Sequence, residues 1–206
     1  MSPPLVLLLL RGRAEAVRAW ARKGLLPVWV VPGREWTLVV PAARARSAPP
    51  YDDPVALLGG RPLAGRLRPS VCLVADGQRA VVALQGAGRA QVQRWLVWTA
   101  GVGCTRVEGL PHAPVGLLAE TAAPGAAVRE RLEEALRADT RSGAQTIDDL
   151  LDALQLPGTG VLTARLDAGQ LPDVVRVEPD ERVVERFDAF IAHESRLQDE
   201  LQDPRY

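Results

Sequence analysis

Two short turns that combine glycine with arginine are the strongest candidates for chemistry in this sequence. Arg11-Gly12-Arg13 and Gly86-Ala87-Gly88-Arg89 each follow an apolar run and precede a segment with helical spacing. A helix N-terminus offers unpaired N–H groups, glycine admits a ligand to the backbone, and arginine binds carboxylates or phosphates in bidentate fashion. The pattern predicts an anion site formed by Gly12, Arg13, Gly88 and Arg89. Neither turn completes a phosphate-loop or GxGxxG fingerprint, so ordinary tight turns are the alternative.

A second basic feature is the connection between residues 41 and 69, which is rich in Pro, Gly and Arg. Basic loops can grip a phosphate backbone, and a nearby aromatic such as Tyr51 can stack on an unpaired base. No RNP, KH or helix-turn-helix signature accompanies these charges, so nucleic-acid binding stays an alternative to other uses of this loop. The five arginines concerned are Arg44, Arg46, Arg61, Arg66 and Arg68.

The five tryptophans divide by their spacing into core and surface candidates. The helical and strand patterns place Trp20, Trp29 and Trp95 in the core. Trp36 and Trp98 are the remaining candidates for an exposed stacking platform.

Nucleophiles and metal ligands lack the spacings that catalysis or metal binding needs. There is no GxSxG, and Cys72 and Cys104 stand inside strand-like segments, which predicts two buried reduced thiols. His112 and His193 are far apart and belong to no zinc pattern. The acidic groups Asp148, Asp149 and Asp152, or Asp167 and Asp173, match no calcium loop and predict charged surfaces. We therefore expect no catalytic residue, no metal and no cofactor.

The elements that must position the turns begin with the run Leu5–Leu10. Six apolar residues without a basic leader are too few for a secretory core or a membrane helix, and Arg11 ends the run. A short continuous apolar run is typical of a strand covered on both faces. We expect a central buried strand here, and no association with a membrane.

Alternating strand and helix patterns fill the rest of the first half. We expect a βαββ unit and then a ββαβ unit, with a short helix between them that Asp53 caps. Asp76-Gly77 predicts a hairpin turn. The expected strands are 5–10, 27–31, 36–40, 71–75, 80–85 and 104–107, and the expected helices are 14–23, 53–58 and 89–99. This order favours an α+β, ferredoxin-like sheet.

The two halves also show a faint internal similarity. GRAEAVRAW at 12–20 resembles GRAQVQRW at 88–95, although the Gly-Arg-Ala triplets and the Val and Trp positions align at offsets that differ by one residue. Ancient duplication and chance both remain open.

Charge is strongly segregated along a chain whose formal net charge is zero. Residues 1–119 hold 15 Lys+Arg and 6 Asp+Glu, a net charge of +9, and residues 120–206 hold 10 and 19, a net charge of −9. This asymmetry predicts two units, a basic α+β domain over 1–119 and an acidic, mostly helical unit over 120–206, which dock on each other or have different partners.

The acidic unit is expected to contain three helices and a β-hairpin. The spacing predicts helices over 124–138 and from a Thr146–Asp149 capping box to Pro157, strands over 161–166 and 174–177, and a final helix over 180–202 that Asp180 caps. The final helix is long for the short strands before it, so we expect part of its apolar stripe to meet another chain or the first unit. Its predicted contact residues are Phe187, Phe190, Ile191, Leu197 and Leu201.

These observations favour a noncatalytic binding protein that acts through macromolecular contacts, either with a protein partner or by self-association. The chain has one lysine among 25 basic residues, which indicates a G+C-rich bacterial genome and, with the absence of a leader, a cytoplasmic location. A small-anion-binding module or enzyme that uses the Gly-Arg turns is one alternative. Nucleic-acid binding through the basic unit is the other.

Overall fold

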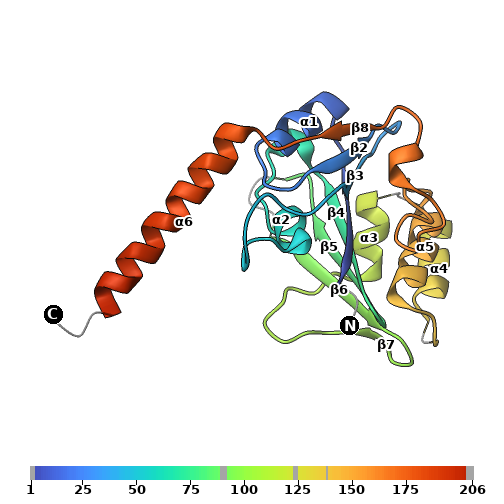
Figure 1. Ribbon diagram of the computed structural model, residues 1–206. Coiled ribbons are helices and arrows are strands. Elements are labelled where there is room, and N and C mark those ends of the chain that lie inside the picture. Colours follow the sequence, from blue (N-terminus) through green and yellow to red (C-terminus); the bar gives the residue numbers. More distant parts are fainter. Residues whose placement is uncertain (1–2, 89–91, 123–124, 138, 203–206) are drawn as a thin grey trace.

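The computed structural model is an α+β structure built on one antiparallel sheet (Figure 1). It describes residues 3–88, 92–122, 125–137 and 139–202. Within these residues there are eight strands in the order β7-β6-β5-β4-β1-β3-β2-β8. The strands are β1 (Leu5–Leu10), β2 (Val28–Val31), β3 (Thr37–Pro41), β4 (Ser70–Asp76), β5 (Arg79–Gln85), β6 (Arg94–Thr99), β7 (Gly103–Thr105) and β8 (Val175–Val177). The helices are α1 (Ala14–Arg22), α2 (Pro54–Gly59), α3 (Val115–Ala122), α4 (Ala126–Ala135), α5 (Gly143–Leu154) and α6 (Glu181–Gln202).

The leucine run forms β1, in the interior of the sheet. β1 pairs with β3 on one side and with β4 on the other, and every residue from Val6 to Leu10 is buried. Because side chains alternate along a strand, Leu7 and Leu9 enter one core, and Val6 and Leu8 enter the other. The expectation of a central strand covered on both faces is confirmed.

Helices cover the first face of the sheet through α1, α2 and the 3₁₀ turn Gly65–Leu67. Val17 and Trp20 of α1 pack there with Leu58 of α2. The Asp53 carboxylate accepts hydrogen bonds from the first N–H groups of α2, at 2.9 Å from Val55 N, and Pro54 stands in the first turn. The predicted cap of this short helix is therefore confirmed.

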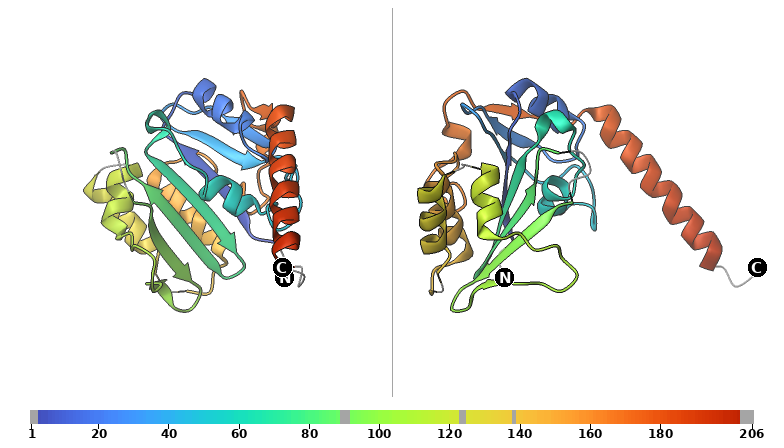
Figure 2. Two further views of the ribbon diagram at one scale, coloured as in Figure 1. Left: turned by 90° about the vertical axis from the view of Figure 1, so that its left-hand side faces the viewer. Right: turned by 180° about the vertical axis from the view of Figure 1, so that it is seen from behind.

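The opposite face is covered by α3, α4 and α5, which lie together on one side of the sheet in Figures 1 and 2. Ile147 and Leu151 of α5 and Leu118 of α3 are fully buried against this face. At its start, α5 lies directly on the β4–β5 hairpin, where Gly143 N donates to Gly77 O at 2.9 Å. A side chain at Gly143 would collide with the Arg79 carbonyl, so this close approach requires glycine.

The segment expected as a helix over 89–99 is a strand where the structure describes it. β6 alternates between partly exposed and buried residues, with Leu96 and Trp98 in the core, and pairs with β5 along its length. Pairing of β6 with β5 at this side of the sheet overrides the helical pattern predicted over 89–99. The helix predicted in the ββαβ unit is therefore wrong, because β6 is a strand.

The C-terminal segment also differs from its prediction in two places. Residues 161–166 form turns instead of a strand, and Ala164 takes a positive φ of 55°. The cap of α5 is Ser142, whose side chain and that of Gln145 form the capping box, so the predicted Thr146–Asp149 box is wrong. Thr146 instead donates its hydroxyl to the Ser142 carbonyl from within the helix, at 3.2 Å. β8 is a strand as expected, but it pairs with β2, so the predicted β-hairpin of the acidic unit is wrong. Asp180 precedes α6 as expected, and its carboxylate accepts a hydrogen bond from Arg182 N at 3.0 Å.

The tryptophan and cysteine predictions are partly reversed. Trp36 and Trp98 are 4% and 0% exposed, so neither is a surface platform, whereas Trp29 and Trp95 are only partly buried. Trp98 lies within β6, and Trp36 directly precedes β3. Alternation along a strand does not say which of its two faces is buried, so the sequence did not place these two rings in the core. Cys72 is buried as expected, but Cys104 is exposed on β7, at the edge of the sheet.

The final helix leaves the body of the molecule (Figures 1 and 2). Its 22 residues span about 33 Å at 1.5 Å per residue. Its first turns contact the loop 42–53 through the Arg46–Glu181 ion pair and the Tyr51–Phe187 ring contact. Among the described residues, none of the helices combines the length and the apolar character needed to cross a bilayer.

We expect the Leu9→Ala substitution to lower the free energy of unfolding by about 2–5 kcal/mol, because Leu9 is fully buried at the centre of the sheet. Urea unfolding followed by circular dichroism measures this. Leu5→Ala is the matched control at the exposed start of the same strand, where Leu5 is 45% exposed, and a loss of about 0.5 kcal/mol or less is expected. Equal losses in the two variants would contradict the central role of β1.

Candidate functional site

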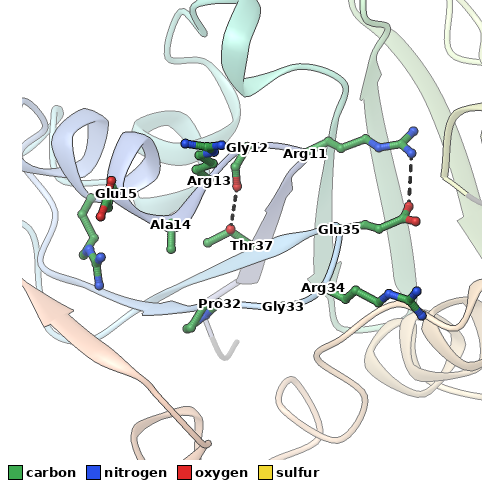
Figure 3. A pocket seen from close by; sticks show the side chains of 11 residues that line it. Arg11, Gly12, Arg13, Ala14, Glu15, Pro32, Gly33, Arg34, Glu35 and Thr37 are labelled. Carbon is green, nitrogen blue, oxygen red and sulfur yellow. Dashed lines mark hydrogen bonds and ion pairs between the residues drawn. The ribbon is translucent and has the colours of Figure 1, made fainter.

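An open cavity of about 540 Å³ lies where β1 ends and α1 begins (Figure 3). The turn Arg11–Arg13 forms one wall, the first turns of α1 add Glu15 and Arg18, and the β2–β3 turn supplies Arg34 and Glu35. Four arginines and two glutamates therefore line it, so the cavity carries a net positive charge. The predicted anion-binding residues Gly12 and Arg13 both lie here.

Packing determines the shape of the Gly12 turn. A Cβ atom at Gly12 would lie 2.9 Å from Leu67 Cδ2 and 3.0 Å from the Arg66 carbonyl oxygen, so the turn requires a residue without a side chain. The buried Thr37 hydroxyl donates to the Gly12 carbonyl at 2.8 Å and ties the turn to β3. Glycine at this position therefore has a structural reason that does not involve a ligand.

The arginines of the cavity do not converge on one point. Arg11 pairs with Glu35 at 3.1 Å, and both side chains are largely exposed. In Figure 3 the guanidinium groups of Arg13 and Arg34 point to different sides of the cavity. A ligand here would meet Arg13 and the first N–H groups of α1 rather than a closed ring of cations.

The second Gly-Arg turn emerges at the same end of the sheet as the first. Leu10 of β1 faces Ser70 of β4, and Ser70 faces Gln85 of β5, so β1 and β5 run in the same direction with β4 between them. Gly88 accepts a hydrogen bond from Arg68 Nη1 at 3.3 Å. Arg89 lies outside the described residues, and β6 follows instead of the expected helix. An anion site shared by the two Gly-Arg turns stays a prediction. Only the first turn leads into a helix among the described residues, which is α1.

Structural contacts occupy three of the five arginines of the basic connection. Arg46 pairs with Glu181 of α6 at 2.9 Å, and Arg68 donates to the Leu63 carbonyl at 2.9 Å. Arg61 stacks over the Trp20 ring at 4.3 Å and donates to the Trp20 carbonyl at 2.6 Å. Burial of Arg61 lowers its pKa to about 10.

The other two arginines of this connection, Arg44 and Arg66, are exposed. No hydrogen bond or ion pair joins their side chains to another described residue. These two are the part of the predicted basic surface that remains available to a ligand.

The acidic residues of α5 have structural roles. The buried Asp148 carboxylate accepts hydrogen bonds from Gly160 N at 2.9 Å, Thr163 Oγ1 at 2.7 Å and Arg165 Nη2 at 2.6 Å. These bonds anchor the turns over residues 158–166, and the hydrogen bond and charge of Asp148 raise the pKa of Arg165. Within the described part of the chain, no three His, Cys, Asp or Glu side chains are grouped as a metal site would require.

The cysteines offer no activated nucleophile. Burial raises the pKa of Cys72 to about 12 and also raises that of Cys104, so both are protonated thiols near neutral pH. The two thiols thus differ in exposure, but the pKa of each is raised.

The base of α6 forms a small apolar cluster with the loop 42–53, which includes Tyr51. The Tyr51 and Phe187 rings pack edge to face with centroids 5.5 Å apart. Ile191 lies further along the same side of a groove of about 320 Å³ that Pro49 and Tyr51 also line. Charge segregation in the sequence indicated such docking, but not that Tyr51 and Glu181 would form it.

Beyond this cluster, Phe190 is exposed at 56%. It is the most exposed large apolar side chain described on the helix. Leu197 and Leu201 belong to α6, but their side chains lie outside the described set. The predicted contact helix therefore contains an anchored part and a free part.

Comparison of the chain with known protein families, with curated proteins and with solved structures finds no match.

We expect Asp148→Ala to lower the free energy of unfolding by about 2–3 kcal/mol, because Gly160 N and Thr163 Oγ1 lose their buried acceptor. Chemical denaturation measures the change. Asp152→Ala is the control on the same helix, because Asp152 is exposed and its carboxylate accepts only from Thr159 Oγ1 among the described residues. A wild-type value for Asp148→Ala would show that the 158–166 turns do not depend on this carboxylate.

Proposed function

We propose that this chain is a noncatalytic, bacterial cytoplasmic binding protein, and that α6 is the element with which it contacts another macromolecule. The observation that carries the proposal is the projection of α6 from the body with Phe190 exposed. A helix that covers its own core would bury such a side chain. A helix that presents it, while being held firmly at its base, is suited to pack against a partner in the helix-in-groove or helix-pair manner.

The anchoring at the base supports a functional rather than incidental projection. Asp180 N donates to the Arg22 carbonyl at 2.7 Å, Val184 is 6% exposed, and the Arg46–Glu181 pair and Tyr51–Phe187 contact fix the direction of the first turns. Holding the helix in place before binding reduces the entropy lost when a partner docks. The distal turns can therefore act as a preorganised contact surface.

A small-anion-binding role, which includes enzymes that use such a site, is the second candidate. The cavity at the start of α1 favours it, because Arg13 and the α1 N-terminus face the same open space with more cations than anions around them. Nucleic-acid binding has less support, since only Arg44 and Arg66 of the basic connection lack structural partners among the described residues.

We also propose that the first four strands form a ferredoxin-like unit. The strand order β4-β1-β3-β2, with α1 and α2 on the same face, supports this arrangement. Duplication of the unit has less support, because β6 stands where the second copy would have its helix.

We expect the Phe190→Asp substitution to abolish the capture of bacterial lysate proteins by the tagged full-length chain, because it places a charge at the centre of the contact face. Quantitative mass spectrometry of the captured proteins measures the loss. Ala189→Asp makes the same change at the adjacent exposed position on another side of α6 and should leave capture unchanged. The same set of captured proteins for wild type and Phe190→Asp would refute the role of α6.

If the anion site operates, phosphate or a nucleotide should raise the Tm of the wild-type chain, and Arg13→Ala should remove most of that increase. Differential scanning fluorimetry against a panel of phosphates and carboxylates measures it. Arg44→Ala serves as the control, because Arg44 is exposed outside the cavity lining. Equal shifts in both variants would indicate a nonspecific ionic effect.

A further inference from the structure

One side of α6 carries a heptad pattern, of which only Phe187 has a ring contact with the body among the described residues. Apolar residues and one glutamate recur at intervals of 4, 3, 4, 3 and 4 residues, which is the spacing of a two-helix seam. Of the positions with described side chains, all four are at least partly exposed, Phe190 most among the apolar ones. The seam consists of Val183, Phe187, Phe190, Glu194, Leu197 and Leu201.

The buried apolar residue of the first turns, Val184, lies outside this seam. Val184 anchors α6 to the body, and the partly buried Phe187 packs edge to face with Tyr51. The helix therefore has one row that holds it to its own chain and an adjacent row open to a second helix.

The charges beside the seam distinguish the two orientations of a helix pair. In an antiparallel pair centred at Ala192, Val183 lies opposite Leu201, Phe187 opposite Leu197, and Phe190 opposite Glu194 of the second copy. The flanking positions then bring Arg186 of each copy beside Glu200 of the other, which pairs opposite charges twice. In a parallel pair, the two Glu194 carboxylates would meet in the seam, and Arg186 would lie beside an apolar position.

We infer that α6 pairs with α6 of a second copy of this chain, antiparallel and centred near Ala192. The inference rests on the proposed function, because it names the partner of the same contact helix. Opposite charges flank the seam in this orientation alone, and the projection of α6 leaves space along the helix for a second one (Figures 1 and 2). A seam of about 28 Å with a glutamate in it is short, so the pair should form in the micromolar range and not as an obligate dimer.

The test measures the mass of the full chain by size exclusion with light scattering between about 5 and about 200 µM, since dimer formation depends on concentration. We expect a mass that rises from 22.2 kDa toward twice that value. Phe190→Asp should remain monomeric, while Ala189→Asp should dimerise as wild type does.

Charge reversal then tests the orientation. Arg186→Glu and Glu200→Arg alone should each weaken the dimer about tenfold, because each puts like charges together at two symmetric places. The double variant should restore the wild-type dissociation constant. Circular dichroism of each variant confirms that α6 remains helical.

Three outcomes would overturn the inference. A monomer at every concentration excludes self-pairing, a dimer insensitive to Phe190→Asp places the interface elsewhere, and charge variants without rescue exclude this antiparallel register. In the first case, capture of other proteins that still depends on Phe190 would leave the proposed function standing. Loss of both readouts would remove the proposed function as well.

Discussion

Burial of β1 on both faces is the constraint on which the rest of the structure depends. An apolar strand at the centre of a sheet needs a cover on each side, and the chain supplies α1 and α2 on one face and α3, α4 and α5 on the other. The second cover comes entirely from residues after 112, so the sheet and the later helices share one core. Helices α4 and α5, which belong to the acidic unit predicted over 120–206, pack in the same core as β1.

The parts of the fold that the sequence predicts correctly are those fixed by local chemistry. The run Leu5–Leu10, the Asp53 cap with Pro54 and the Asp76-Gly77 turn each depend on residues a few positions apart, and all three are found. The errors concern segments whose conformation depends on distant partners. β6 is a strand because it pairs with β5, and the turns over 161–166 are held by Asp148 through residues 12 to 17 positions away, from Gly160 to Arg165.

The candidate sites show the same division. The turn at Gly12 and the final helix are candidates that the local sequence suggests, and both stay predictions, whereas the common direction of β1 and β5 comes from the structure. Side-chain contacts between distant segments were not predicted. The sequence suggests one basic surface that includes Arg46, Arg61 and Arg68, yet each has a separate partner in the structure. Composition reports how many cations a loop contains, but only the fold determines which of them are already neutralised or stacked.

The strand β8 joins the sheet beside β2, although some 144 residues separate Val31 from Val175 in the chain. A ribosome releases the chain from its N-terminus, so β2 and β3 emerge long before the strand that completes their edge. During that interval the outer backbone groups of β2 have no partner, and they are open to other chains in the cell. α6 follows β8 directly in the chain, so the contact helix is synthesised only after the strand that closes this sheet edge.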